Sequence, residues 1–313
     1  MGMPAPALEQ LIDDLASGGL PRDGDYSLLS DLPRDVGEWL KSGWGRIPTE
    51  GRISILERAT ELSEANVELN FATLGRIALD DPSAEVRERA VLSLWEAEGR
   101  DLPERLSALV ASDENPGVRA AAAKGLFRFV EALTLDRLDR AVGATVVQTL
   151  RAAASDYGEA VDVRAAAIEA LGPSPEEWAA EIIGDAYETG DPTLQLAALR
   201  AMGYSGQDRW EEYIAEQLVS DNPELRFEAV LAAANLGSEE LVPAVGELLA
   251  DEEPEVVLAA VEALGEIGGE EAHELLVEFR EHVPAGMEES LDIAIETAAG
   301  GGLFRRFGDL PEE

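Results

Sequence analysis

The side chains that most often carry enzyme chemistry are scarce in this sequence. The chain has two histidines, His273 and His282, and no cysteine. A thiolate nucleophile and a cysteine metal site are therefore excluded, and a Ser-His-Asp triad would need one of the two histidines. The sequence contains no Gly-x-Ser-x-Gly motif and no glycine-rich phosphate loop after a predicted strand. We therefore expect a protein without catalytic residues, metal or cofactor.

Carboxylates are so frequent that pairs of them carry no information about a site. The chain has 64 acidic and 24 basic residues, a net charge of −40, and only Lys41 and Lys124 are lysines. The acids are spread over the polar faces of predicted amphipathic helices. We interpret this as adaptation to a halophile's cytosol, where salt screens the repulsion within a hydrated carboxylate surface. An acidic protein from a GC-rich mesophile is the alternative.

The compartment is expected to be the cytoplasm. The first ten residues lack the cationic and apolar regions of a signal peptide. No apolar run approaches the 18 residues that would predict a membrane span. We therefore expect no contact with a membrane.

One motif, represented by residues 221–237 (DNPELRFEAVLAAANLG), recurs six more times in variant form, which gives seven copies. Successive copies are 32, 45, 31, 31, 31 and 31 residues apart when they are aligned on the apolar residue after the turn. A fixed period of this length indicates a solenoid of stacked repeats. The aligned residues are Val86, Val118, Val163, Leu194, Leu225, Val256 and Met287.

Each copy predicts a helical hairpin, a first helix A followed by a second helix B. Small or apolar residues recur four and eight positions after the aligned residue, which places them on one face of helix B. Alanines there let neighbouring helices approach closely. An Asp or Asn with a nearby Pro precedes most B helices, as in Asp191-Pro192, and supplies the N-terminal cap. One hairpin cannot bury both its faces, so successive hairpins must stack.

The residue after the aligned position is an arginine in four copies, and together with the preceding Asp it resembles the Asp…Val-Arg signature of HEAT repeats. Over residues 66–299 the chain is most similar to the short, alanine-rich variety associated with phycobilisome bilin lyases. The resemblance implies a structural ladder of hydrogen bonds between adjacent repeats, interrupted where Gln195, Val257 and Glu288 replace the arginine. Anion binding by the arginines is the functional alternative. The four ladder residues are Arg87, Arg119, Arg164 and Arg226.

The predicted fold is an all-α, right-handed solenoid of about seven HEAT-like hairpins. We expect residues 1–65 to form an N-terminal helical cap, residues 66–299 the solenoid, and residues 300–313 a flexible tail. The 45-residue interval should lengthen the helix around 135–154 or the turn near 155–161, either as part of a binding face or by drift.

The tail is apolar and basic in an acidic protein. Its Phe304, Arg305, Arg306 and Phe307 are interpreted either as a docking peptide or as a segment that folds back over the last hairpin.

Charge is distributed unevenly along the repeats. Residues 81–164 contain 15 acidic and 11 basic residues, whereas residues 207–299 contain 25 acidic and 3 basic residues. In proteins that resemble this one, the B helices line the concave face. We therefore predict a cationic and aromatic partner-binding patch on the first two B helices, although these side chains could also pack internally or pair with nearby acids. Its residues are Arg89, Trp95, Lys124, Phe127 and Arg128.

The favoured function is a non-catalytic scaffold or adaptor that binds a protein or peptide on the concave face. A bilin-lyase-like or other protein-modifying activity is one alternative. HEAT-like deoxyhypusine hydroxylases carry several His-Glu pairs, whereas this chain has only His273-Glu274. Nucleic-acid binding through residues 81–164, as in HEAT-like DNA glycosylases, is the other alternative, and the net charge argues against it.

Overall fold

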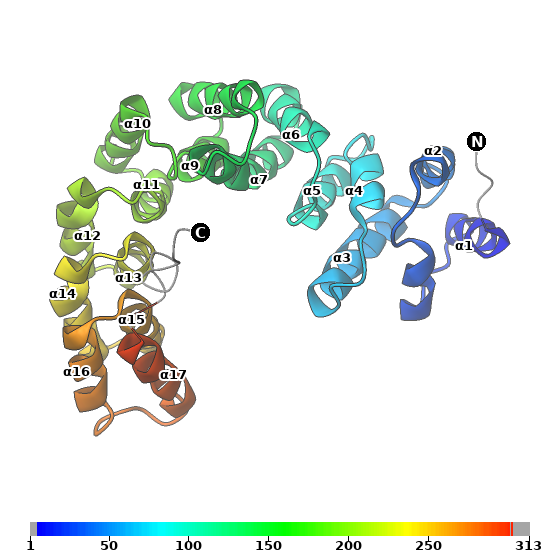
Figure 1. Ribbon diagram of the computed structural model, residues 1–313. Helices are drawn as coiled ribbons and strands as arrows, with labels where there is room; N and C mark the ends of the chain where they lie inside the picture. The colour runs from blue at the N-terminus through cyan, green and yellow to red at the C-terminus, as the bar shows by residue number, and fades with distance from the viewer. Residues whose placement is uncertain (1–4, 301, 303–313) are drawn as a thin grey trace, which may run out of the picture. The chain divides into compact units, whose positions relative to one another are not determined.

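The computed structural model describes residues 5–300 and residue 302, apart from the side chain of Arg34. This part of the chain contains α-helices and short 3-10 helices and no strand. It divides into two compact units, Met1–Ala167 and Ile168–Glu313, which are described separately here as unit 1 and unit 2. The prediction of an all-α solenoid of stacked hairpins is confirmed (Figure 1).

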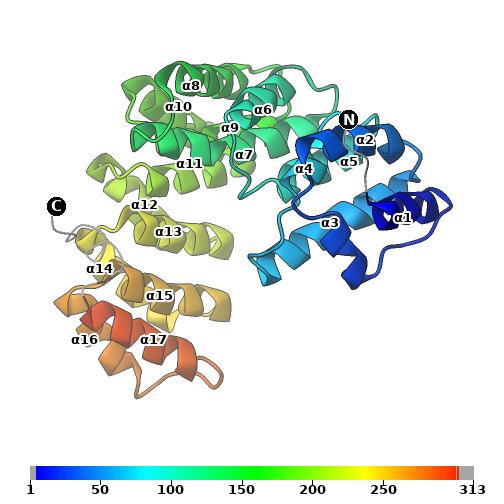
Figure 2. The same cartoon turned by 45° about the vertical axis from the view of Figure 1, so that its right-hand side comes forward.

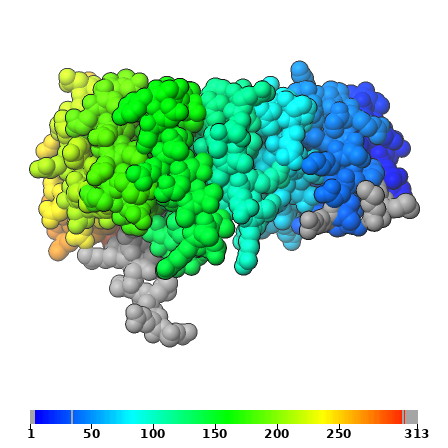
Figure 3. Space-filling model, turned by 90° about the horizontal axis from the view of Figure 1, so that it is seen from above, coloured from blue at the N-terminus to red at the C-terminus, as the bar shows by residue number. Residues whose placement is uncertain are grey.

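Unit 1 contains three stacked hairpins, the first helix of a further hairpin and a short N-terminal segment. The B helices α3, α5 and α7 pack in succession, while α2 packs on α4 and α6 on α8 in the layer of A helices. Side chains fill the spaces that the ribbon leaves between these helices (Figure 3). The helices are α1 (Pro6–Ala16), η1 (Asp23–Leu28), α2 (Arg34–Trp44), α3 (Thr49–Ala65), α4 (Ala72–Ala78), α5 (Ala84–Ser93), α6 (Asp101–Ser112), α7 (Pro116–Thr134) and α8 (Arg140–Ser155), followed by α9 (Val161–Ala170), within which the unit ends.

Unit 2 repeats the same two-layer arrangement. The B helices α11, α13, α15 and α17 stack in order (Figure 2). The A helices α12 and α14 pack together, as do α14 and α16. The helices are α10 (Glu177–Glu188), α11 (Pro192–Tyr204), η2 (Asp208–Trp210), α12 (Glu211–Leu218), α13 (Pro223–Leu236), η3 (Glu239–Leu241), α14 (Val242–Glu247), η4 (Leu248–Ala250), α15 (Pro254–Ile267), α16 (Glu270–Phe279) and α17 (Glu288–Ala299).

The turns before the B helices end one helix and begin the next. The side chains of Asn115, Asp191 and Asn222 accept hydrogen bonds from backbone N–H groups in the first turns of α7, α11 and α13. A proline at the next position has no N–H to leave unpaired. Asp113 and Asp251 lie in the turns themselves, before the first helical residue. The side chain of each accepts a hydrogen bond from the backbone N–H two residues later and stabilises the turn. The boundaries are thus set locally.

Small residues allow the B helices of unit 2 to lie close together. A Cβ atom at Gly203 on α11 would lie 2.8 Å from the Cα of Ala232 on α13. The same contact joins Gly265 on α15 to Ala294 on α17. Backbone therefore packs on backbone, and the alanines around these contacts are buried. This arrangement agrees with the close approach that the alanine pattern predicts.

The N-terminal region contains a hairpin that the repeat alignment does not include. Helix α2 packs on α4, and α3 packs on α5, as the A and B helices of a further repeat would. Gly51, Ile55 and Ala59 occupy its aligned, fourth and eighth positions, and all three are buried. The long interval is taken up by two helices, the 19-residue α7 and the 16-residue α8. The division into cap, repeats and tail stays a prediction.

Candidate binding surface

Three of the four expected ladder arginines join adjacent repeats through a carboxylate. Arg87 donates from Nε and Nη2 to the two carboxylate oxygens of Asp113, at 2.7 and 2.8 Å. Arg226 contacts Asp251 in the same manner, at 2.7 and 2.8 Å. Arg119 uses Glu159, at 2.9 and 2.6 Å, in place of an aspartate.

Each ladder arginine also donates to its own turn. Arg87 Nη1 lies 2.9 Å from the carbonyl oxygen of Asp81, and Arg226 Nη1 lies 2.8 Å from that of Ser220. The Arg226 hydrogen bond lowers the pKa of Asp251, and the Arg119 hydrogen bond lowers that of Glu159. The ladder carboxylates are thus held ionised, and these arginines have structural partners.

Arg164 makes its described contacts within its own hairpin. Its Nε donates to the carbonyl oxygen of Ala154 at 3.3 Å, and its guanidinium lies 4.8 Å from the ring centroid of Tyr157. In the same turn, Glu159 is the acid that bonds to Arg119. Arg164 therefore stabilises its own hairpin.

A further rung, which the sequence reasoning did not include, involves Arg52 on α3. Its guanidinium forms a buried ion pair with Asp81, and Trp44 Nε1 donates to the same carboxylate at 2.8 Å. Arg52 follows Gly51, the aligned position of the N-terminal hairpin. The sequence already indicated this rung, because Arg52 stands at the ladder position and Ile55 and Ala59 follow Gly51 at the helical spacing of the repeat.

The solvent side of the B helices, which we call the B face, recurs in the repeats of each unit. Its centre on each helix is the residue six positions after the aligned apolar residue, and none of these residues is buried. The central residues are Glu57, Leu92 and Lys124 in unit 1, and Glu169, Arg200, Leu231, Glu262 and Ile293 in unit 2.

Two of the three expected cations of the unit 1 patch already have partners within the chain, Arg89 at the surface and Arg128 in a partly buried position. Arg89 Nε donates to Glu57 Oε1 on the preceding B helix at 2.9 Å. Arg128 Nη2 donates to the carbonyl oxygens of Leu94 and Ala97, at 3.0 and 2.7 Å, in the turn after α5. Burial lowers the pKa of Arg128. Arg128 therefore holds the turn that carries the predicted aromatic contact, and the free positive charge is smaller than the sequence suggested.

Trp95 and Lys124 remain accessible, and Leu92 joins them. The side chains of Leu92 and Trp95 are 47% and 48% exposed, three residues apart at the end of α5. Lys124 is exposed on the next B helix and makes no ion pair with the described residues. Phe127 is half-buried on α7. Leu92 was not among the predicted patch residues. Its place six residues after the aligned Val86 could have identified it as exposed on the same face.

In unit 2 the centre of the B face is an ion-pair network. Arg200 on α11 pairs with Glu228 on α13, with Nε 2.9 Å from Oε2, and with Glu169 on α9 at 3.5 Å. The hydrogen bond with Glu228 raises the pKa of Arg200. The tail residues Phe304, Arg305, Arg306 and Phe307 lie outside the described residues.

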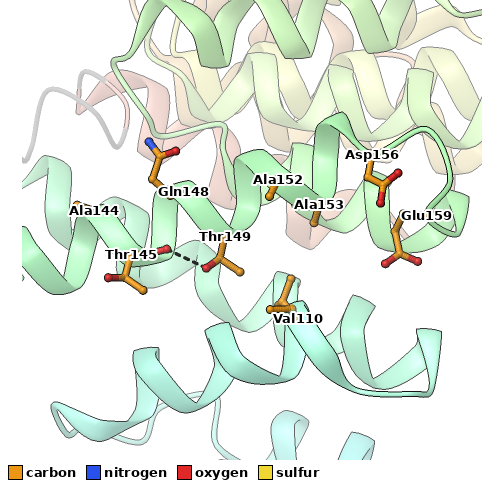
Figure 4. Close-up of a pocket in the computed structure, with 10 residues that line it drawn as sticks. Val110, Ala144, Thr145, Gln148, Thr149, Ala152, Ala153, Asp156 and Glu159 are labelled. Carbon is orange, nitrogen blue, oxygen red and sulfur yellow. Dashed lines mark hydrogen bonds between the residues drawn. The ribbon is translucent and has the colours of Figure 1, made fainter.

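A separate groove of about 670 Å³ lies between the A helices α6 and α8 of unit 1 (Figure 4). Val110 on α6 faces Thr149 and Ala153 on α8, and Asp156 and Glu159 lie at one end of the groove. The Thr149 hydroxyl donates to the carbonyl oxygen of Thr145 at 2.9 Å. Glu159 is already paired with Arg119. The groove offers small side chains and no nucleophile with an adjacent base.

Neither histidine belongs to a recognisable metal site. His273 is half-buried on α16, and His282 is exposed beyond it. Among the described residues, no group of three His, Cys, Asp or Glu side chains could hold a metal ion. No helix in that part of the chain combines the length and apolar character needed to cross a lipid bilayer.

The ladder and the stacked hairpins define a helical-repeat protein. A comparison with family models identifies the repeat family. The family model for HEAT repeats matches residues 71–157 and 211–287, more than half of the chain. The chain therefore belongs to the HEAT repeat family. No curated protein sequence matches it.

Solved structures of helical repeats show similarity at low identity. The Escherichia coli protein YibA is 16% identical, with a TM-score of 0.48 over 96% of this chain and 99% of its own. The complex of CpcE and CpcF, a phycocyanin lyase from Nostoc, is 17% identical, with a TM-score of 0.47 over 72% of this chain and 94% of that chain. A structure of Kap95p with RanGDP is 16% identical, with a TM-score of 0.43 over 96% of this chain and 44% of that chain.

Proposed function

We propose that the protein is a non-catalytic scaffold or adaptor that binds a protein or peptide through the B face of unit 1. The observation that supports this most directly is the exposure of Leu92 and Trp95 at the end of a packed helix. Large apolar side chains in such positions are typical of interaction sites, and tryptophan is enriched among the residues that dominate binding energy. HEAT family membership is consistent with this role, because stacked repeats present extended surfaces.

The chemistry of the surface indicates the kind of partner. Leu92 and Trp95 supply apolar contacts, and Lys124 on the neighbouring B helix supplies a positive charge. Arg128 keeps the Trp95 turn in place by bonding its carbonyl groups. A segment that combines an apolar side chain with a carboxylate would satisfy both parts of this surface. The partner is therefore expected to be a protein segment of that composition.

The test is affinity capture from the native host's lysate at its own salt concentration, followed by mass spectrometry. The variant carries Leu92→Ala, Trp95→Ala and Lys124→Ala, which leave the internal partners of Arg89 and Arg128 intact. Val219→Ala is the control, because Val219 is 72% exposed after helix α12 of unit 2. A stoichiometric protein retained by the control and lost by the triple variant would support the proposal. Equal capture by both variants would reject this surface.

Nucleic-acid binding through residues 81–164 is a weaker alternative. It requires free cations to contact phosphates, but Arg89 is paired with Glu57 and Arg128 donates to backbone carbonyls. A DNA or RNA affinity that falls steeply with salt and is lost with Lys124→Ala would favour this alternative. The other alternative is a protein-modifying activity on the same scaffold. A captured protein that carries a covalent modification would favour it.

A further inference from the structure

The last two B helices of unit 2 present a mixed acidic and apolar surface. Glu262 and Glu266 lie one turn apart on α15, and neither forms an ion pair with the described residues. Ile293 is 59% exposed at the equivalent position of α17, and Glu296 is exposed on the same helix. Burial raises the pKa of Glu266, and the charge of Glu262 raises it further. Among the described residues, no cation lies on this part of the B face to pair with Glu262 or Glu266.

The same face contains a cation earlier in the unit. Arg200 on α11 pairs with both Glu228 on α13 and Glu169 on α9. Residues 207–299 contain three basic side chains, and each has a carboxylate partner elsewhere. Arg209 pairs with Glu177, Arg226 with Asp251 and Arg280 with Asp292. The described part of the unit therefore leaves no arginine or lysine of this region for the α15 carboxylates.

The path of the chain after α17 leads back to this place. Helix α17 ends at Ala299, and the Gly300 N–H bonds to the carbonyl oxygens of Glu296 and Thr297. Gly302 then lies against the C-terminal end of α15, since a Cβ there would be 2.5 Å from the carbonyl oxygens of Glu266 and Ile267. Its φ of +76° is a backbone conformation that favours glycine. Gly302 therefore lies beside the C-terminal end of α15.

The composition of the following residues complements this surface. Leu303-Phe304-Arg305-Arg306-Phe307 places two arginines between two aromatic residues. Three or four residues of chain span up to about 10–14 Å, and adjacent packed helices are about 8–10 Å apart. The chain between Gly302 and the two arginines is therefore long enough for Arg305 and Arg306 to reach both α15 carboxylates. The tether at Gly302 also raises the local concentration of this segment above that of any free competitor.

We propose that residues 303–313 dock in cis on the B face of α15 and α17, where Arg305 and Arg306 pair with Glu262 and Glu266 and the two phenylalanines cover Ile293. This inference does not depend on the proposed role of Leu92 and Trp95 in unit 1.

The experiment measures the distance between two spin labels on the full chain. Because the chain has no cysteine, Asn235→Cys on α13 and Gly308→Cys introduce the only thiols. Docking in cis predicts a narrow distance distribution by double electron–electron resonance. Adding Glu262→Gln and Glu266→Gln should broaden it. Glu270→Gln and Glu274→Gln on α16 form the matched control, with the same charge change and spacing on an A helix, and should leave it narrow.

Two results would overturn the proposal. A broad distribution in the labelled reference protein would show that the segment does not dock. A narrow distribution unchanged by the two substitutions on α15 would show that it docks elsewhere. Singly labelled molecules are mixed as a further check, and a narrow intermolecular distance between them would assign the segment to a second copy of the chain. Recovery of the narrow distribution when Glu262→Arg and Glu266→Arg are combined with Arg305→Glu and Arg306→Glu would support direct pairing.

Discussion

Single arginines connect the repeats because each one bonds to two of them. The guanidinium of Arg226 spans from the Ser220 carbonyl in its own turn to both carboxylate oxygens of Asp251 in the next turn. This fork geometry is specific to arginine, since lysine has a single charged nitrogen. The pair is largely buried, with 15% of the Arg226 side chain and 5% of the Asp251 side chain exposed. Removing one partner therefore leaves the other charge largely buried without its counter-ion.

We predict that Arg226→Ala destabilises unit 2 by about 3 kcal/mol, because it leaves the Asp251 carboxylate buried without its cation. Arg209→Ala is the comparison, since Arg209 and Glu177 form a solvent-exposed pair whose loss should cost much less. Urea unfolding followed by circular dichroism measures both variants. Equal losses in the two variants would show that the ladder pair behaves as an ordinary surface pair.

The same pair predicts a dependence on pH. The hydrogen bond from Arg226 holds the pKa of Asp251 below its ordinary value of 3.8. A lowered pKa stabilises the folded state above the unfolded-state value, and this contribution is lost as the pH falls through the folded-state pKa. The native protein should therefore lose stability below about pH 4 more steeply than Arg226→Ala does. Parallel curves for the two proteins in acid titrations of the melting temperature would contradict this.

At the scale of elements, glycine sets the spacing of the unit 2 B helices. Gly203 lets α11 contact the backbone of Ala232 on α13 directly. The rigid partner is main chain, so an added methyl group cannot be accommodated by a rotamer change. Gly184 on α10 differs, because a Cβ there would lie 3.7 Å from the Trp210 ring, at an ordinary contact distance.

We predict that Gly203→Ala destabilises unit 2 by about 1–3 kcal/mol through overpacking against α13. Gly184→Ala should be neutral or stabilising by up to about 1 kcal/mol, since alanine favours the helix. Hydrogen exchange at the amides of α11 and α13 locates the effect, and the melting temperature gives its size. Stabilisation by both substitutions would mean that the two helices can separate at little cost.

At the scale of the whole molecule, charge outweighs every local pair. The net charge of −40 on 313 residues places many like charges within interaction distance, and the excess is greatest in residues 207–299. Such self-repulsion opposes the compact state, and salt screens it. The exposed ion pairs, such as Lys41 with Asp80, weaken in salt as well, but each of them contributes little.

We predict that the melting temperature rises between roughly 0.1 M and 3 M potassium chloride, where the Debye length falls below about 3 Å. This behaviour would support the proposed origin in a halophile. Potassium chloride and sucrose are compared at equal osmolality, because sucrose favours burial without screening charge. An unchanged or lower melting temperature in 3 M salt would contradict the interpretation of the acidic surface.

Most of the fold was predictable, and the candidate site only in part. The seven-fold recurrence and the helical spacing predicted the hairpins, because those signals are local in sequence. The N-terminal hairpin escaped the alignment, since Gly51 stands where other repeats have a larger apolar residue. The sequence left open whether Arg89 and Arg128 bind a partner or pair within the chain, because Glu57 and the Leu94 carbonyl lie 32 and 34 residues away.

The sequence by itself determined the class of this protein. Periodic apolar residues, capped turns and the ladder arginines specify stacked hairpins, because each depends on contacts within a repeat or with the next one. Only the tertiary structure decided which charges are free, since pairing depends on which side chains meet across helices. It tied Arg89 and Arg128 to internal partners, left Leu92 and Trp95 exposed, and left Glu262 and Glu266 without a cation among the described residues.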